Sequence, residues 1–86
     1  MKILFTEKAW EDYIWLTENN VQLHKKANSL IKEIQREPFG GLGKPEFLKG
    51  HLHGFLSRRL NSEHRIIYQV KGETIIIVSM RYHYIK

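Results

Sequence analysis

The stretch HRIIYQVKGETIIIVSMRYHY, residues 64–84, is rich in β-branched and aromatic side chains and is interrupted by Lys71-Gly72. This composition is typical of β-strands, and a glycine-containing pair between two such runs favours a tight turn. We therefore expect an antiparallel hairpin formed by residues 64–70 and 74–84. A third run, residues 55–60, predicts a further strand beside this hairpin.

The two faces of the predicted sheet carry different side chains, because residues two apart in a strand point to the same side. We expect the side with Ile76, Val78 and Met80 to pack on helices. The opposite, exposed side would then hold a concentrated cationic patch. Its expected members are Arg59, Arg65, Arg81 and His83.

The residues before this sheet show helical periodicity. Met1–Phe5 predicts a short strand, and Thr6 can cap the helix that follows it. Asn19-Asn20 ends that helix and can cap a second one, which is predicted to end near Glu37 because Pro38 follows. The apolar stripe of the second helix consists of Leu23, Ala27, Leu30, Ile31 and Ile34.

The segment PFGGLGKP, residues 38–45, contains both prolines and is predicted to be the loop between the helical part and the sheet. The expected fold is therefore α+β, with a small, twisted, mainly antiparallel sheet packed on two N-terminal helices. A chain of 86 residues is too short for two independent cores, so we expect one domain over residues 1–86.

The composition and the distribution of charge narrow the range of possible functions. The net charge of +5 lies entirely in residues 44–86, which contain eight basic and three acidic groups. A neutral first half and a basic second half favour a scaffold with a surface for a polyanion, although a solvated basic face without function is an alternative.

No cysteine is present, MKILFTEKAW lacks the pattern of a signal peptide, and no apolar run approaches the roughly 20 residues of a membrane span. We expect a cytoplasmic protein without a membrane segment.

The basic half also contains the groups that RNA cleavage needs. A base must take the proton of the 2′-hydroxyl, an acid must protonate the leaving 5′-oxygen, and cations must stabilise the charge on phosphorus. Glu46 in KPEFLK and His83 in RYHY are candidates for the base and the acid. The candidate cations are the arginines Arg58, Arg59, Arg65 and Arg81. The alternatives are that Glu46 is a surface ion-pair partner, His83 a solvated residue, and Arg65 a member of an ordinary surface charge network.

Other chemistry has less support in the sequence. His51-Leu52-His53 places two imidazoles two residues apart, but no further ligand is spaced to complete a zinc site. GGLGKP lacks the Lys-Ser/Thr ending of a phosphate-binding loop, and no GxSxG motif is present. We expect neither a metal nor another cofactor.

Four motifs resemble one known family: KPEFLK (44–49), GFLSRRL (54–60), EHRIIY (63–68) and RYHY (81–84). In this order and spacing they are similar to those of YoeB-type toxins, within the RelE superfamily of bacterial toxin–antitoxin modules. The resemblance covers essentially the whole chain. It implies a fold like that of microbial ribonucleases and a ribosome-dependent endoribonuclease that cleaves mRNA in the A site of the 70S ribosome.

The resemblance also assigns roles to residues. Glu46 would be the general base, His83 the general acid, and Arg65 would stabilise the charge on the transferring phosphate. Lys49 and Arg59 would bind the RNA backbone and Tyr84 would orient the substrate, with Arg81 and Lys44 as further substrate contacts. The implied product is a 2′,3′-cyclic phosphate, formed without a metal.

The resemblance further implies a cognate acidic antitoxin that covers the basic face, and a homodimer or a toxin–antitoxin hetero-oligomer. Two alternatives remain at this stage. One is a non-enzymatic growth inhibitor on the same fold, such as the gyrase-targeting relatives. The other is a nucleic-acid-binding module, which would bind in a strongly salt-dependent way without cleavage.

Overall fold

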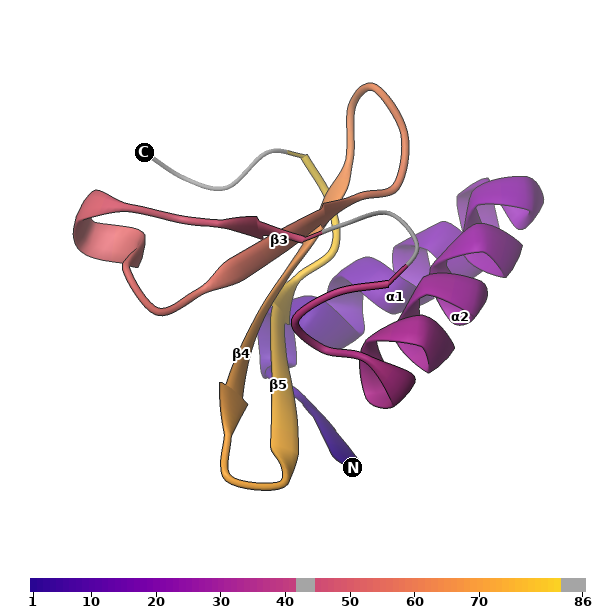
Figure 1. Cartoon of the computed structure of the whole chain (residues 1–86). Coiled ribbons are helices and arrows are strands. Elements are labelled where there is room, and N and C mark those ends of the chain that lie inside the picture. The colour runs from indigo at the N-terminus through magenta and orange to yellow at the C-terminus, as the bar shows by residue number, and fades with distance from the viewer. Residues whose placement is uncertain (42–44, 83–86) are drawn as a thin grey trace.

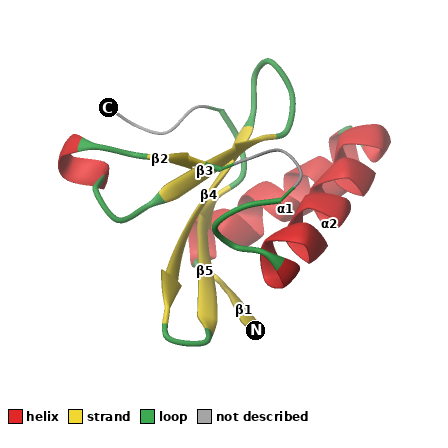
Figure 2. Ribbon diagram, in the orientation of Figure 1, coloured by secondary structure: helices red, strands yellow, loops and turns green. Residues whose placement is uncertain are grey.

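Two helices cover one face of a five-stranded sheet in the computed structural model, which describes residues 1–41 and 45–82 (Figure 1, Figure 2). The strand order across the sheet is β1-β5-β4-β3-β2. This arrangement confirms the predicted α+β fold with both helices on the N-terminal side of the chain. The elements are β1 (Lys2–Phe5), α1 (Glu7–Asn19), α2 (Val21–Arg36), β2 (Glu46–Phe47), the 3₁₀ turn η1 (Gly50–Leu52), β3 (Leu56–Arg59), β4 (Arg65–Lys71) and β5 (Thr74–Ser79).

Both helices begin at the predicted caps. The Thr6 hydroxyl accepts a hydrogen bond from Ala9 N at 3.2 Å, and the Asn20 side chain accepts one from Leu23 N at 3.0 Å. Each cap satisfies an N–H group that a helix leaves without an internal partner. The apolar stripe of α2 is buried at Leu23, Ala27, Leu30 and Ile34, as its spacing predicts.

The sheet is built on the predicted hairpin of β4 and β5. Its turn consists of Gly72 and Glu73, one residue later than expected, and Gly72 adopts a φ of 59°, which glycine tolerates best. β1 pairs with β5 in parallel, with Ile3 opposite Ile75, so the sheet is mixed rather than wholly antiparallel. β2 pairs antiparallel with β3 at the far edge and was not expected as a strand.

The predicted orientation of β5 is wrong for two of its three residues. Ile75 and Ile77 are fully buried in the core shared with the helices, whereas Ile76 is only half-buried on the opposite face of the sheet. A bulge follows, because Ile67 pairs with Ser79 while the next residue of β4 pairs with Ile77. The bulge leaves Val78 unpaired and returns Met80 to the core.

β5 also ends earlier than predicted, at Ser79 instead of Tyr84. The backbone N–H of Met80 donates to the buried Asp12 carboxylate of α1 at 2.9 Å rather than to a neighbouring strand. Tyr82 then adopts a φ of 62°, which an extended strand does not allow. The last predicted strand residues, 83 and 84, lie outside the described part of the chain.

Arg58 is the largest fully buried side chain and lies on the helix-facing side of β3. Its Nη2 donates to Glu37 O at 2.5 Å and to Gly40 O at 2.6 Å, in the loop that follows α2. Its Nε donates at 3.1 Å to the Tyr68 hydroxyl, which in turn donates to Pro38 O at 2.6 Å. Burial raises the pKa of Tyr68, so the hydroxyl keeps the proton that it donates. Arg58 is therefore a structural cation, not one exposed to a substrate as the sequence suggested.

Candidate active site

Three neighbouring strands place polar side chains together on the sheet face directed away from the helices, here called the outer face. The antiparallel register sets Glu46 of β2 opposite Ser57 of β3, and Arg59 opposite Arg65 of β4. All four side chains therefore point to the same side of the sheet. Sequence reasoning expected Arg59 and Arg65 to share a face, and the pairing confirms this.

Arg65 joins two of these neighbours. Its Nη2 donates to Glu46 Oε1 at 2.9 Å, and its Nε donates to Ser57 Oγ at 2.5 Å. The Arg65 side chain is only 12% exposed, whereas that of Glu46 is 56% exposed. The guanidinium is thus held on a rigid strand, and the carboxylate beside it reaches solvent. The Glu46–Arg65–Ser57 cluster is the central feature of the site.

Ser57 was not among the predicted site residues. It is fully buried, and its hydroxyl accepts a hydrogen bond from Arg65 Nε, which helps to orient the guanidinium. The signal in the sequence was its alternation with Arg59, which places both on one face. The contact with Arg65 needs the pairing of β3 with β4, which the sequence does not specify residue by residue.

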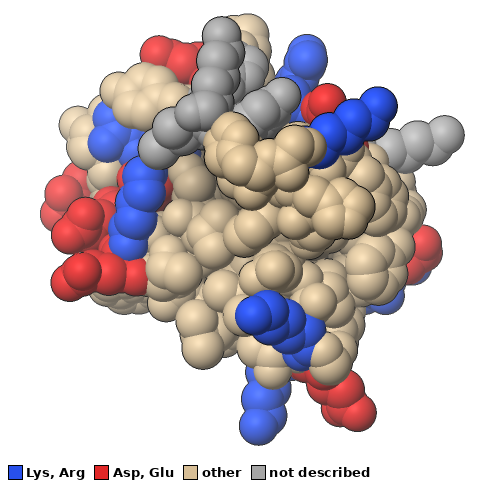
Figure 3. Space-filling view, turned by 90° about the vertical axis from the view of Figure 1, so that its left-hand side faces the viewer, with Lys and Arg blue, Asp and Glu red and all other residues tan. Residues whose placement is uncertain are grey.

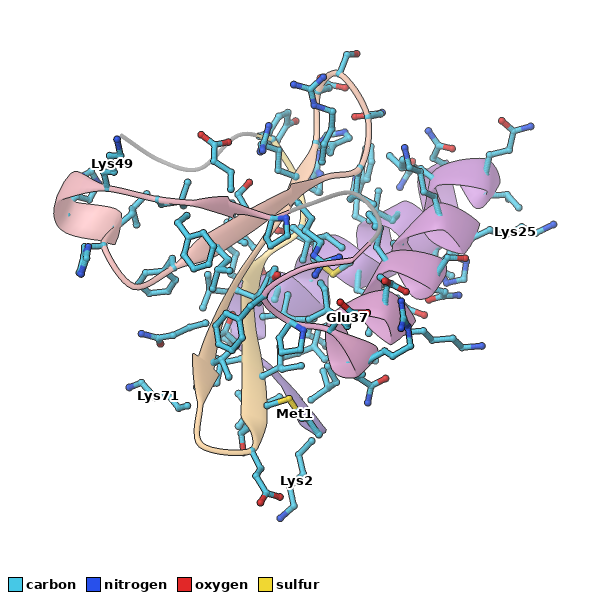
Figure 4. All side chains as sticks on the ribbon, in the orientation of Figure 1. Met1, Lys2, Lys25, Glu37, Lys49 and Lys71 are labelled. Atoms are coloured by element: carbon cyan, nitrogen blue, oxygen red, sulfur yellow. The ribbon has the colours of Figure 1, made fainter. Side chains whose placement is uncertain are left out.

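Arg59 lies opposite Arg65 and is exposed, and Lys49, three residues after Glu46, is exposed as well. Within residues 1–41 and 45–82, the Arg59 side chain makes no hydrogen bond or ion pair, so it can receive an anion. Two like charges directly opposite each other are unfavourable in a sheet, which disfavours contact between the guanidinium groups of Arg59 and Arg65. Lys49 is exposed where the chain enters η1 and extends away from the ribbon, on the opposite side of the molecule from Lys25 of α2 (Figure 4).

Arg81 does not join the outer-face cluster. Its guanidinium lies 3.7 Å from the ring centroid of Trp15 on α1 and 4.9 Å from that of Tyr82. The predicted shared face of Arg59, Arg65 and Arg81 is therefore wrong, because β5 ends before Arg81 and the chain turns there. Whether Arg81 contacts RNA stays a prediction.

Three predicted residues, Lys44, His83 and Tyr84, lie outside the described residues. The described chain nevertheless leads to the cluster: Arg65 N donates to Tyr82 O at 3.1 Å. The residue immediately before His83 is thus bonded to the backbone of Arg65.

The charge of the outer face is dispersed. Figure 3 shows this side of the molecule, where Lys and Arg side chains occupy separate positions around a broad area without charged groups. The half-buried Ile76 belongs to this face. Of the four expected members of the cationic patch, Arg59 and Arg65 share this face, Arg81 does not, and His83 lies outside the described residues.

Among the described residues, no three His, Asp or Glu side chains are grouped so that they could hold a metal ion. No described helix is both long and apolar enough to cross a bilayer.

The mixed sheet with two helices on one face is similar in fold to solved YoeB-type toxins. The chain is 41% identical to a YoeB/ParE toxin from Agrobacterium tumefaciens, with a TM-score of 0.93 over 98% of this chain and 100% of that one. It is 45% identical to the Staphylococcus aureus YoeB, solved in a heterotetrameric YoeB-YefM toxin-antitoxin complex (TM-score 0.87) and as a YoeB dimer (TM-score 0.88), each over 98% of both chains.

Comparison of sequences also relates the chain to YoeB toxins. The chain is 52% identical to toxin YoeB of a Synechocystis species over 98% of both sequences. The family model for the YoeB-like toxin of bacterial type II toxin-antitoxin systems matches residues 5–84. The chain belongs to this family.

Proposed function

We propose that this toxin is a metal-independent, ribosome-dependent endoribonuclease that cleaves mRNA in the ribosomal A site and so inhibits translation. The observation that supports this most is the hydrogen bond between Glu46 and Arg65, with its N···O distance of 2.9 Å. It brings a solvent-accessible carboxylate and a fixed phosphate-binding group within one hydrogen bond of each other. Proton transfer and charge stabilisation at one phosphate require this proximity.

In the proposed reaction, Glu46 takes the proton of the 2′-hydroxyl as that oxygen attacks the adjacent phosphorus. Arg65 stabilises the negative charge that grows on the non-bridging oxygens. The bond from phosphorus to the 5′-oxygen breaks, and His83 donates a proton to this leaving oxygen. The products are a 2′,3′-cyclic phosphate and a free 5′-hydroxyl, so Glu46 ends protonated and His83 ends deprotonated.

The remaining predicted residues bind the substrate. Arg59 and Lys49 are exposed cations suited to the phosphates on either side of the cleaved bond. Lys44 and Tyr84 are proposed as further contacts from the family resemblance. The ribosome would supply most of the substrate platform, because the described residues of the outer face include few cations.

We also propose that a cognate acidic antitoxin inhibits the toxin by covering the outer face, and that the toxin forms a homodimer or a hetero-oligomer with it. The heterotetramer and the dimer of the S. aureus relative support this. Hydrogen-exchange footprinting of the toxin with the product of an adjacent acidic reading frame tests it. Protection only on α1 and α2, without any on β2, β3 or β4, would contradict it.

The function is tested by expression from a tightly controlled promoter with mapping of mRNA 5′ ends. Wild type should arrest growth and produce new 5′ ends within translated codons. The double variant Glu46→Gln, His83→Gln should do neither. Arrest and cleavage that persist in this variant would refute the mechanism. Intact mRNA with DNA-damage signalling would instead indicate a gyrase-type inhibitor.

A further inference from the structure

His64 is a buried histidine next to the candidate site, and the proposed reaction does not use it. It directly precedes β4 and is 4% exposed. Its Nδ1 accepts a hydrogen bond of 2.7 Å from the backbone N–H of Tyr82. Its Nε2 lies 3.3 Å from Glu63 Oε1. The ring thus connects the start of β4 to the end of the described chain.

The bond to Tyr82 fixes the tautomer of the ring. A backbone N–H can only donate, so Nδ1 must carry the lone pair. The proton of the neutral ring is then on Nε2, directed at Glu63. The backbone of His64 is itself held by the Asn61 turn: His64 N donates to Asn61 Oδ1 at 2.6 Å, and His64 O accepts from Leu60 N at 2.9 Å. The acceptor is therefore presented from a fixed position.

Tyr82 is held from several sides in an uncommon conformation. Its N–H bonds to His64 and its carbonyl accepts from Arg65 N at 3.1 Å. The Tyr82 ring packs against His64, with centroids 5.2 Å apart, and its hydroxyl accepts from Arg81 Nη2 at 3.0 Å. Its φ of 62° makes it the only non-glycine residue with a positive φ among residues 1–41 and 45–82. A conformation of this kind costs free energy and persists where its surroundings determine it, which occurs often at functional sites.

We propose that His64 is a positioning residue for the proposed active site. By accepting from the Tyr82 N–H it stabilises the left-handed turn from which the chain enters His83, the proposed general acid. This inference rests on the proposed function. It assigns His64 no contact with RNA, since it acts through the Tyr82 peptide.

A matched pair of variants isolates the hydrogen bond. His64→Asn places an amide oxygen where Nδ1 was. In His64→Leu the new side chain is similar in size to asparagine but has no hydrogen-bond acceptor. We expect single-turnover cleavage on programmed ribosomes to be about tenfold slower in His64→Leu than in His64→Asn, because small misplacements of a catalytic group are costly. The KM for programmed ribosomes should stay similar in both. Equal rates in the two variants would overturn the proposal.

Two further measurements separate positioning from general stability. Amide exchange at Tyr82 should be fast in His64→Leu and slow in His64→Asn; equal protection in the two would contradict the proposed bond. In a His83→Gln background, His64→Leu should slow the residual cleavage no further, since no acid remains to be positioned. Equal slowing in both backgrounds would show that His64 acts elsewhere. If His83→Gln alone cleaves at the wild-type rate, the assignment of His83 as the general acid has failed. Equal cleavage rates in His64→Leu and His64→Asn would instead refute the positioning role of His64.

Discussion

Arg58 and Arg59 are neighbours in β3, yet their surroundings are opposite. Arg58 points towards the helices, is fully buried, and donates to two main-chain carbonyls and to the Tyr68 hydroxyl. Arg59 points to the outer face and is exposed, and no bond of its side chain is found within the described ranges. The charge of Arg58 is paired within the fold, while that of Arg59 is exposed to solvent and has no partner among residues 1–41 and 45–82.

Two carboxylates differ in burial, although both have an ion-pair partner. Asp12 is buried and accepts from Lys8 Nζ at 2.7 Å and from Met80 N at 2.9 Å, so it ties α1 to the end of β5. Glu46 is exposed and has Arg65 as its ion-pair partner. Buried polar groups must be paired within the protein, whereas exposed ones need no such pairing for stability. The helix-facing side of the sheet, here called the inner face, therefore holds a buried charge that is paired within the fold, whereas Arg59 and Glu46 of the outer face are exposed to solvent.

Among the substitutions at Arg65, Arg59 and Ser57 of the outer face, Arg65→Met should reduce activity most. It removes the guanidinium proposed to stabilise the reacting phosphate, so we expect the cleavage rate on programmed ribosomes to fall by about 10²–10³-fold. Single-turnover kinetics measure this, with Lys71→Met of the β4–β5 hairpin as the control. A loss of less than about fivefold would mean that Arg65 stabilises no charge in the transition state.

Arg58→Met should instead damage the inner face. It removes the hydrogen bonds from the buried guanidinium to the carbonyls of Glu37 and Gly40 and to the Tyr68 hydroxyl, and a hydrogen bond to a charged group contributes about 1.5–3 kcal/mol. We expect unfolding at least about 10 °C lower, measured by circular dichroism. Arg59→Met is the matched control and should shift the midpoint by less than about 3 °C. Equal shifts for the two would remove the distinction between the faces.

Arg59→Gln tests the outer face by binding. Removing one phosphate contact should weaken binding to RNA or to programmed ribosomes several-fold and lower the salt slope by about 0.7–0.9. Titrations at several salt concentrations measure the slope. An unchanged slope would exclude a phosphate contact by Arg59.

Ser57→Ala is expected to have the smallest effect. It deletes the acceptor of Arg65 Nε but keeps the charge and the ion pair with Glu46. We expect a loss of about three- to tenfold in cleavage rate, as for one hydrogen bond to a charged group that acts indirectly. Ser57→Thr, which retains the hydroxyl, should recover part of it. No loss in Ser57→Ala would mean that Glu46 alone orients Arg65.

Local signals in the sequence were sufficient for much of the fold. Thr6 and Asn20 cap the helices because their side chains reach N–H groups three residues ahead, and Gly72 marks the hairpin because its φ is positive. The phase of β5 was not readable, since residues 75–78 are all apolar and either face could be buried. The bulge that follows leaves no mark in the sequence.

The candidate site was also predictable only in part, because the long-range contacts of its residues leave no local signal in the sequence. The sequence pattern predicted that Arg59 and Arg65 share a face, and the resemblance pointed to Glu46. The burial of Arg58 could not be predicted, because its acceptors are main-chain carbonyls of a loop about 20 residues earlier, and every residue has a carbonyl. The direction of Arg81 depends on where β5 ends, which is decided by Asp12 of α1.

Glu46→Gln measures the central claim most directly, because it changes one exposed group of the outer face and no contact of the core. Single-turnover cleavage on programmed ribosomes should slow by about 10²–10⁴-fold, with an unfolding midpoint within about 3 °C of wild type. Glu73→Gln, an exposed acid of the β4–β5 turn, should cleave at the wild-type rate. Cleavage by Glu46→Gln at the wild-type rate would contradict the account.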